Sequence, residues 1–237
     1  MKGEPAVARI DKSALTRLEI VTEASKQFLE KGFSNTTVSS IAKELEMSTG
    51  NLTFHYPTKE HLLSELVDIL CTFHWHKMEQ EANEGISSVL AVCLELTAMA
   101  AASEDDEVIK DFLLSAYSSP VCLAVIRKND AIRSKEVFQS YRPDWTDEQF
   151  AEAELLVSGI EFATLMTAGD PIPLETRIKG AMSIILGIYG VSEEIRNVKL
   201  NKVFAMDYRS IGKNAIAEFK DYVKETNDKA FRELLRR

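Results

Sequence analysis

The spacing of apolar residues is the feature that most constrains the fold of this chain. Along almost all of its 237 residues the apolar positions recur every three to four residues, and no segment shows the sustained alternation of a half-buried β-strand. Ten glycines and six prolines are few for this length, which also disfavours a turn-rich all-β protein. The sequence therefore predicts an all-α fold.

Capping residues divide the chain into helices. Thr37, Ser48 and Thr58 each precede a helical apolar pattern and are candidate N-caps, while Gly32 and Pro57 are stops. The front of the chain should form a helix over 13–31, two short helices after Thr37 and Ser48, and a long helix from Thr58 to about 84. Further breaks predict about six more helices, over roughly 86–102, 104–117, 120–140, 146–168, 174–190 and 192–226.

Acidic residues are distributed unevenly along the chain. The net charge is −9, yet residues 1–60 hold eight basic and eight acidic side chains, so the acidic excess lies in residues 61–237. Between Lys31 and Lys59 the only acids are Glu44 and Glu46. This asymmetry is typical of a small DNA-binding head on a larger acidic body.

The two short helices have the spacing of a helix-turn-helix, in which Ile41 and Ala42 allow close packing. At 100° per residue, Leu52 and Tyr56 share the core-facing side of the second short helix. Its outward side carries a residue without a side chain, an amide, a hydroxyl and an aromatic ring, from Gly50, Asn51, Thr53 and Phe54. These groups can meet base edges and thymine methyls, so this uncharged face is suited to the major groove of DNA.

Residues 37–63, TVSSIAKELEMSTGNLTFHYPTKEHLL, resemble the DNA-binding region of TetR-family transcriptional regulators. The matching positions are Thr37, Ile41, Ala42, Ser48, Gly50, Leu52, His55, Lys59, Glu60 and Leu62, with conservative replacements at Met47 and Tyr56. The resemblance covers about residues 13–65. It implies a helix-turn-helix DNA-binding domain over 1–60 and a helical effector-binding and dimerisation domain over 61–237, with about nine or ten helices in all.

The resemblance also implies which residues contact DNA. Base edges would be approached by Thr49, Gly50, Asn51, Thr53 and Phe54, and phosphates would be contacted by Thr37, Ser48, His55, Tyr56 and Lys59. Two residues depart from the family pattern. Glu46 stands where the family has glycine, which predicts strain of about 1–2 kcal/mol if its backbone is left-handed. Thr53 replaces the usual tyrosine, so the operator sequence cannot be inferred from relatives.

One such head reads only half of an operator, so we expect a symmetric homodimer on palindromic double-stranded DNA. The resemblance places the dimer interface on the helices expected over 146–168 and 174–190. Small residues that would allow close helix approach there are Gly180, Ala181, Gly187 and Gly190. Ordinary core packing of these helices is the alternative.

Large side chains of the body are candidates to line a largely apolar cavity for a small-molecule effector. They are Phe73, Met78, Met99, Phe112, Tyr117, Phe138, Phe162 and Met166, with Trp75, Trp145 and Tyr189. Core packing is the alternative for each of them. Glu161 interrupts an apolar face and is a candidate buried polar anchor, with a solvated position as the alternative.

No catalytic residue, metal site or cofactor is predicted. The sequence shows no nucleophile–base pair or phosphate-binding loop, and Cys71 and His74 do not belong to a set of three ligands at a recognised spacing. The N-terminus lacks the apolar run of a signal peptide, and no segment has 18 uncharged apolar residues. We therefore expect a cytoplasmic protein with no membrane partner.

The sequence favours a sequence-specific transcriptional regulator, in particular a repressor that a small-molecule effector releases from its operator. Three alternatives stay open. One is a helical interaction protein whose head has lost DNA binding. The others are a small-molecule enzyme with a helical pocket and a DNA-binding regulator without an effector.

Overall fold

The computed structural model describes residues 11–85, 88–167 and 170–235, and within these ranges the chain forms eleven helices and no strand. The helices are α1 (Lys12–Lys31), α2 (Val38–Glu44), α3 (Thr49–His55), α4 (Lys59–Ala82), α5 (Val89–Asp105), α6 (Glu107–Ser118), α7 (Pro120–Phe138), α8 (Asp147–Met166), α9 (Leu174–Ile188), α10 (Glu193–Phe204) and α11 (Tyr208–Leu235). The all-α prediction is confirmed.

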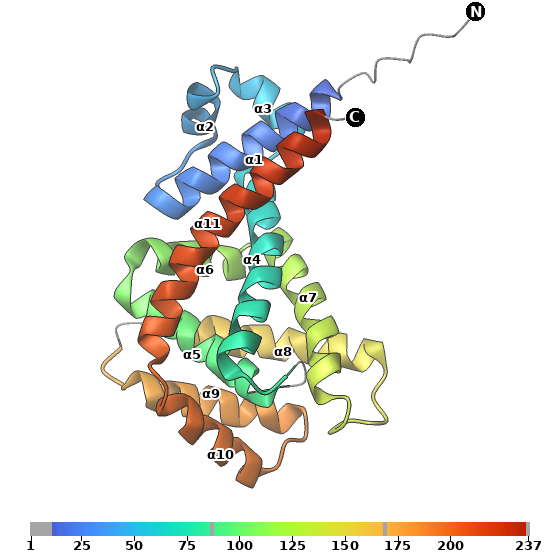
Figure 1. The fold of residues 1–237 in the computed structure, drawn as a ribbon, viewed down its shortest axis with the longest axis vertical. Helices are drawn as coiled ribbons and strands as arrows, with labels where there is room; N and C mark the ends of the chain where they lie inside the picture. Colours follow the sequence, from blue (N-terminus) through green and yellow to red (C-terminus); the bar gives the residue numbers. More distant parts are fainter. Residues whose placement is uncertain (1–10, 86–87, 168–169, 236–237) are drawn as a thin grey trace, which may run out of the picture.

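The helices form a small head and a larger body. Figure 1 shows α1, α2 and α3 at one end, and α5 to α10 at the other. Helix α4 leaves the head and enters the body, where it packs against α5 and α7. At the centre of the body, α5 is buried over most of its length and contacts α4, α6, α8, α9, α10 and α11. A helix that is apolar all round belongs in such a position.

Local capping signals fix the head as the sequence predicts. Thr37 and Ser40 form a capping box at the start of α2, and the Ser48 hydroxyl accepts a hydrogen bond from the Asn51 N–H at 3.1 Å. Thr58 precedes α4 but its side chain does not cap the helix; it pairs with the His61 ring at 2.9 Å instead. The backbone at Thr58 still has the extended conformation that begins a helix.

The last predicted helix, over 192–226, is wrong in its bounds. The structure has two helices here, and α11 continues to Leu235. The break falls at Asp207, whose carboxylate accepts from the Ser210 N–H at 3.2 Å and so satisfies a free donor at the start of α11. Aspartate followed by a helical pattern is a start signal that divides the segment.

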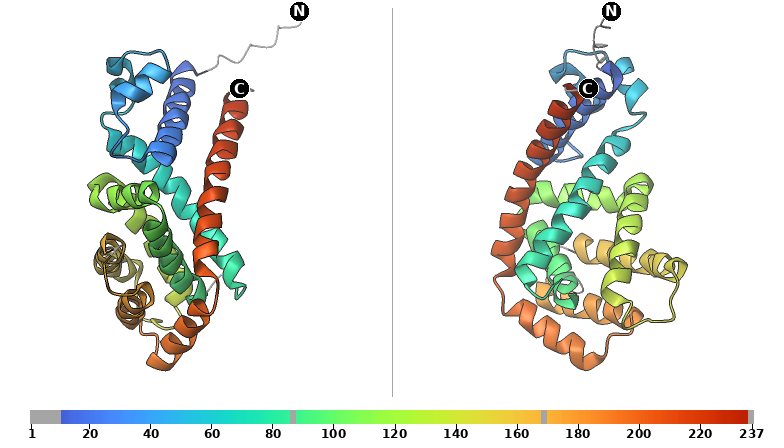
Figure 2. Two further views of the ribbon diagram at one scale, coloured as in Figure 1. Left: turned by 90° about the vertical axis from the view of Figure 1, so that its left-hand side faces the viewer. Right: turned by 45° about the vertical axis from the view of Figure 1, so that its right-hand side comes forward.

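Helix α11 is the unexpected element of the fold. It is 28 residues long and lies beside α4, α5 and α1, so it reaches from the base of the body to the head. Both views in Figure 2 show its far end at the level of the head, and α11 contacts α1. The head is therefore held by the last helix as well as by α4.

Among the described residues, no single helix has both the length and the apolar composition to cross a membrane. Helices α6 and α7 reach that composition only as a pair, which is bent by 87°.

Candidate nucleic-acid interface and interior site

Helix α3 presents a single uncharged face to solvent. Leu52 is fully buried and anchors the helix, whereas Thr49, Gly50, Asn51, Thr53 and Phe54 are exposed. The Phe54 ring is 82% exposed, although burial of so large an apolar side chain is normally favourable. The Thr53 hydroxyl donates to the Gly50 carbonyl at 3.2 Å, which leaves its oxygen free to accept. The five residues predicted to approach base edges thus lie together on one exposed surface.

The five predicted phosphate contacts divide into two groups. Thr37 and Ser48 are exposed N-cap residues, and His55 is partly exposed at the end of α3. These three residues are accessible beside the α3 surface, and their contact with phosphates stays a prediction.

Tyr56 is buried and Lys59 is half-buried in the head, where both have partners of their own, and their contact with phosphates stays a prediction. Tyr56 is only 4% exposed, with the Arg17 guanidinium 4.6 Å from its ring centre. The Lys59 ammonium donates to the carbonyls of Phe33 at 2.7 Å and Thr36 at 2.9 Å, and it lies 3.8 Å from the centre of the Phe33 ring. Lys59 therefore fixes the loop between α1 and α2 to the start of α4.

The turn between α2 and α3 contains the strain that the sequence suggested. Glu46 has a φ of 52°, in the left-handed region that favours glycine. The turn is closed by the Met47 N–H, which donates to the Ala42 carbonyl at 2.9 Å.

The body contains a small cavity between α5, α6, α7, α8 and α9, called the polar cavity because several charged side chains line it. Its volume is about 50 Å³. It is lined by Val92, Glu95, Leu96, Met99, Tyr117, Asp130, Arg133, Ser134, Phe138, Glu154, Val157, Glu161, Met182, Ile185 and Tyr189. A second cavity of about 40 Å³ under α4 shares Glu95, Met99, Tyr117, Asp130 and Arg133 with it, so the two adjoin.

An ion-pair network crosses the junction of these cavities. Glu95 accepts from Arg133 at 2.5 Å and pairs with the His74 ring at 3.2 Å, and Asp130 lies 3.3 Å from Arg133. The Arg133 guanidinium also lies 4.6 Å from the centre of the Trp75 ring. These contacts connect α4, α5 and α7 through charged groups.

The two carboxylates from α8 have neutral partners. Tyr117 donates to Glu161 at 2.9 Å. Ser134 donates to Glu154 at 2.6 Å, and the Tyr189 hydroxyl donates to the same carboxylate oxygen. The sequence identified Glu161 as a candidate buried anchor, and the structure places it half-buried against Tyr117. The sequence did not predict a place in this site for Glu95, Asp130, Arg133 or Glu154. Glu95 could have been found, because it interrupts an apolar run.

The four carboxyl groups at this site differ in pKa, because burial is offset by basic neighbours only at Glu95. Burial opposes ionisation of Glu95, but Arg133 and His74 overcome it and lower the pKa of Glu95 to about 2. For Asp130 burial dominates over the attraction of Arg133 and raises the pKa to about 8. Burial raises the pKa of Glu154, and it raises that of Glu161 well above the usual range, with further repulsion from neighbouring acids.

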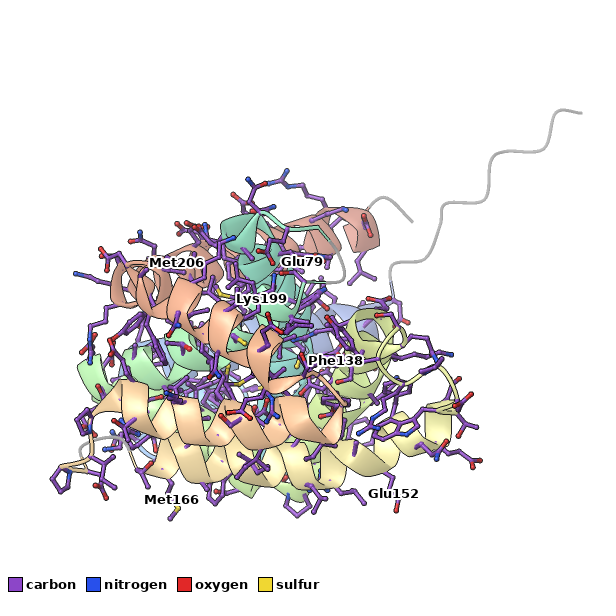
Figure 3. The ribbon with its side chains drawn as sticks, turned by 90° about the horizontal axis from the view of Figure 1, so that it is seen from below. Glu79, Phe138, Glu152, Met166, Lys199 and Met206 are labelled. Atoms are coloured by element: carbon purple, nitrogen blue, oxygen red, sulfur yellow. The ribbon has the colours of Figure 1, made fainter. Side chains whose placement is uncertain are left out.

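Five of the eleven side chains predicted to line an effector cavity do so. Tyr117, Phe138 and Tyr189 line the polar cavity, Met99 lines both cavities, and Phe112 lines a smaller apolar one against α11. The others line none of these three cavities. Phe73 packs on Phe219 and Tyr222 of α11, Met78 is fully buried in the core, and Phe162 packs at its edge. Met166 is wrongly assigned: it is 57% exposed and lies on the outer side of α8, as does Glu152 (Figure 3).

Helices α8 and α9 lie side by side and share an apolar outer surface (Figures 1 and 3). Leu156 is 64% and Ile184 58% exposed, and Gly159 and Gly180 are open to solvent. A shallow groove of about 520 Å³ runs along this surface. Gly187 and Gly190 are not part of it, because they face Arg196 and Arg142 of the same chain. The expected role of these two glycines in close helix approach is therefore wrong.

No three His, Cys, Asp or Glu side chains in the described parts of the chain converge in a way that could hold a metal ion. His74 is paired with Glu95, and Cys71 lines the cavity under α4. Burial raises the pKa of the Cys71 thiol well above its usual value, which disfavours the reactive thiolate.

Comparison with known proteins gives matches to both head and body. The family model described as bacterial regulatory proteins, tetR family, matches residues 20–66. The HTH-type transcriptional regulator QacR of Staphylococcus aureus is 39% identical over 51 residues, which are 22% of this chain and 27% of QacR. The match to this curated relative thus spans about a quarter of its length.

Two solved structures share the fold at low identity. RolR in complex with resorcinol superposes with a TM-score of 0.63 at 16% identity, over 81% of this chain and 96% of RolR. FadR of Thermus thermophilus, a TetR-family repressor in complex with lauroyl-CoA, gives 0.55 at 19% identity, over 72% of this chain and 93% of FadR. A helix-turn-helix head on an all-helical body defines a class of regulatory proteins. Within that class, residues 20–66 of this chain match the TetR family, and the chain shares the fold of these two structures.

Proposed function

We propose that this protein is a sequence-specific transcriptional repressor that binds a palindromic operator as a homodimer. The observation that carries the proposal is the exposed, uncharged face of α3, with Phe54 82% exposed above a fully buried Leu52. A free apolar ring and amide at this position have no role in the core of the head. They fit hydrogen bonding and methyl contact with base edges, as the major groove requires.

The apolar surface of α8 and α9 supports the dimer. Exposed contiguous apolar surface on a soluble protein marks an interaction site, and a twofold pair of helices would bury this surface against its own copy. The open positions at Gly159 and Gly180 would let the partner's helices approach closely. Dimerisation would present two α3 helices to two half-sites of one operator.

The cavity network supports control by a small molecule. Resorcinol and lauroyl-CoA are bound by the two structural neighbours, and the body of this chain encloses a polar cavity in the same fold. Helix α4 joins this cavity to the head, since His74 pairs with Glu95 at one end and Lys59 holds the α1–α2 loop at the other. A ligand that displaces α4 would change the spacing of the two heads and so the population competent for DNA.

The test is selection of DNA duplexes from a random pool, followed by gel shifts with α3 variants. The selected site should be palindromic. Asn51→Ala and Phe54→Ala should each weaken binding to it by about tenfold, for a loss of roughly 1–3 kcal/mol per base contact. Val198→Ala, at another exposed apolar position on α10, is the control. Recovery of no preferred sequence would instead favour a helical interaction protein.

A further inference from the structure

The polar cavity holds more acid than base. Among the described residues that line it, Arg133 is the one basic side chain, and it is already paired with Glu95 and Asp130. Glu154 and Glu161 are seven residues apart on α8, so they lie on the same side of that helix two turns apart. Their partners are the neutral hydroxyls of Ser134, Tyr189 and Tyr117.

One carboxylate oxygen at this site has no partner. Glu154 is 1% exposed, and its Oε2 has no hydrogen bond from any residue in the described ranges. A buried oxygen of this kind is costly, because it has lost water without gaining a donor. Glu154 lines the cavity, so a molecule there could supply the missing donor.

The remaining walls suit a compact apolar group. The rings of Phe138 and Tyr189 stack with centres 4.2 Å apart, and Val157, Met182 and Ile185 complete the lining. The cavity volume of about 50 Å³, with about 40 Å³ in the adjoining cavity, is too small for a lipid chain. It suits a ligand of few atoms with one polar end.

We propose that this cavity binds a small organic cation, in which an ammonium or amidinium head donates to Glu154 and Glu161 and a compact apolar group packs on Phe138. Binding of the cation does not depend on the proposed function; its role as the effector does. An anion would find no free basic group here, because Arg133 is already paired, whereas a cation would favour the ionised forms of Glu154 and Glu161 and supply the donor that Glu154 Oε2 lacks.

Binding of a cation at this site should release protons. Burial favours the protonated forms of Glu154 and Glu161 in the free protein, and a bound positive charge favours their ionised forms. The titratable and charged groups that face them from neighbouring elements are Glu95, Tyr117, Asp130, Arg133 and Tyr189, with His74 and Cys71 beyond Arg133. Cation affinity should therefore rise with pH while the amine remains charged.

The test is calorimetric titration of the full chain with isopropylamine near neutral pH, with isopropanol and acetate as small probes of other charge. We expect isopropylamine to bind about tenfold more tightly than isopropanol, with proton release seen as a heat that depends on the buffer. Glu154→Gln should weaken isopropylamine binding by about tenfold, and Glu161→Gln should also weaken it. Glu152→Gln, exposed on the outer side of the same helix, should not.

Equal binding of isopropanol and isopropylamine, or unchanged binding by both α8 variants, would overturn the proposal. So would the lack of any isopropylamine binding. Thermal unfolding of each variant shows whether it is folded, and Glu161→Gln serves if Glu154→Gln is not. Gel shifts in the absence of isopropylamine test DNA binding separately. Operator binding without cation binding would reject this inference alone, and cation binding without operator binding would reject the proposed function alone.

Discussion

Glu46 has the left-handed backbone that the family pattern reserves for glycine. Glu46→Gly should raise the free energy of unfolding by about 0.5–1 kcal/mol, because relief of strain exceeds the extra entropy of glycine in the unfolded chain. Urea denaturation measures this change. Glu46→Ala removes the same charge but retains the strain, so an equal gain in that variant would show that charge is the cause.

Lys59 should behave as a structural residue. Lys59→Met keeps most of the side-chain length but loses two charge-assisted hydrogen bonds to carbonyls, and we expect a loss of about 1.5–3 kcal/mol in unfolding free energy. Lys43→Met, at an exposed position of α2, should change it by less than about 0.5 kcal/mol. Weaker operator binding by Lys59→Met at unchanged stability would instead restore the predicted phosphate contact.

Asp130 should make the protein less stable as pH rises. Burial raises its pKa to about 8, so the folded state retains a proton that the unfolded state releases above about pH 4. Folded chains therefore bind more protons between these values, and the unfolding free energy falls as pH rises through that window. Asp130→Asn should reduce the fall by about 1–2 kcal/mol in urea titrations at several pH values. An unchanged pH profile would show that Arg133 keeps Asp130 ionised.

The role of a residue could be predicted from the sequence when its partners lie close to it along the chain. The caps at Thr37 and Ser48 and the strained turn at Glu46 were predictable, because their partners lie within a few residues. The role of Lys59 was not, since its acceptors lie more than twenty residues earlier in a loop. The buried acids of the cavity were mostly missed for the same reason: their burial depends on how five helices pack.

At the scale of elements, the contact of α11 with α5 depends on one small residue. A Cβ at Gly212 would lie 2.6 Å from the Ala98 carbonyl oxygen, so Gly212→Ala must push the two helices apart. We expect a loss of about 1–3 kcal/mol in unfolding free energy, which exceeds the gain from alanine's helix propensity. The control is Lys213→Ala, because Lys213 is the next residue along α11 and is exposed. Its unfolding free energy should lie within about 0.5 kcal/mol of that of the unsubstituted protein. Equal stabilities would mean that α11 shifts without cost.

The sequence predicted the helices better than their boundaries and neighbours. Apolar spacing and caps gave the existence of nearly every helix, because both are local properties. The break at Asp207 was missed, and so was the packing of α11 along α1, which depends on surfaces more than 180 residues apart.

For the whole molecule, the critical expectation is the oligomeric state. Leu156→Glu places a charge in the centre of the apolar surface of α8 and α9, and it should convert the dimer to a single chain in sedimentation experiments. Operator affinity should fall with it, because one head contacts only one half-site. Val198→Glu introduces the same charge at a similarly exposed position of α10 and should leave the dimer intact. If both variants remain dimeric, the interface lies elsewhere.

The position of α11 has a consequence for how the protein matures. Leu29 of α1 and Phe219 of α11 line the same small cavity, so the first helix completes its packing only after the last one has been synthesised. A nascent or clipped chain that stops before Tyr208 would leave part of α1 uncovered and its reading surface poorly supported. Only chains that have been translated through α11 would then occupy the promoter. Prematurely terminated chains would not compete with them for the DNA.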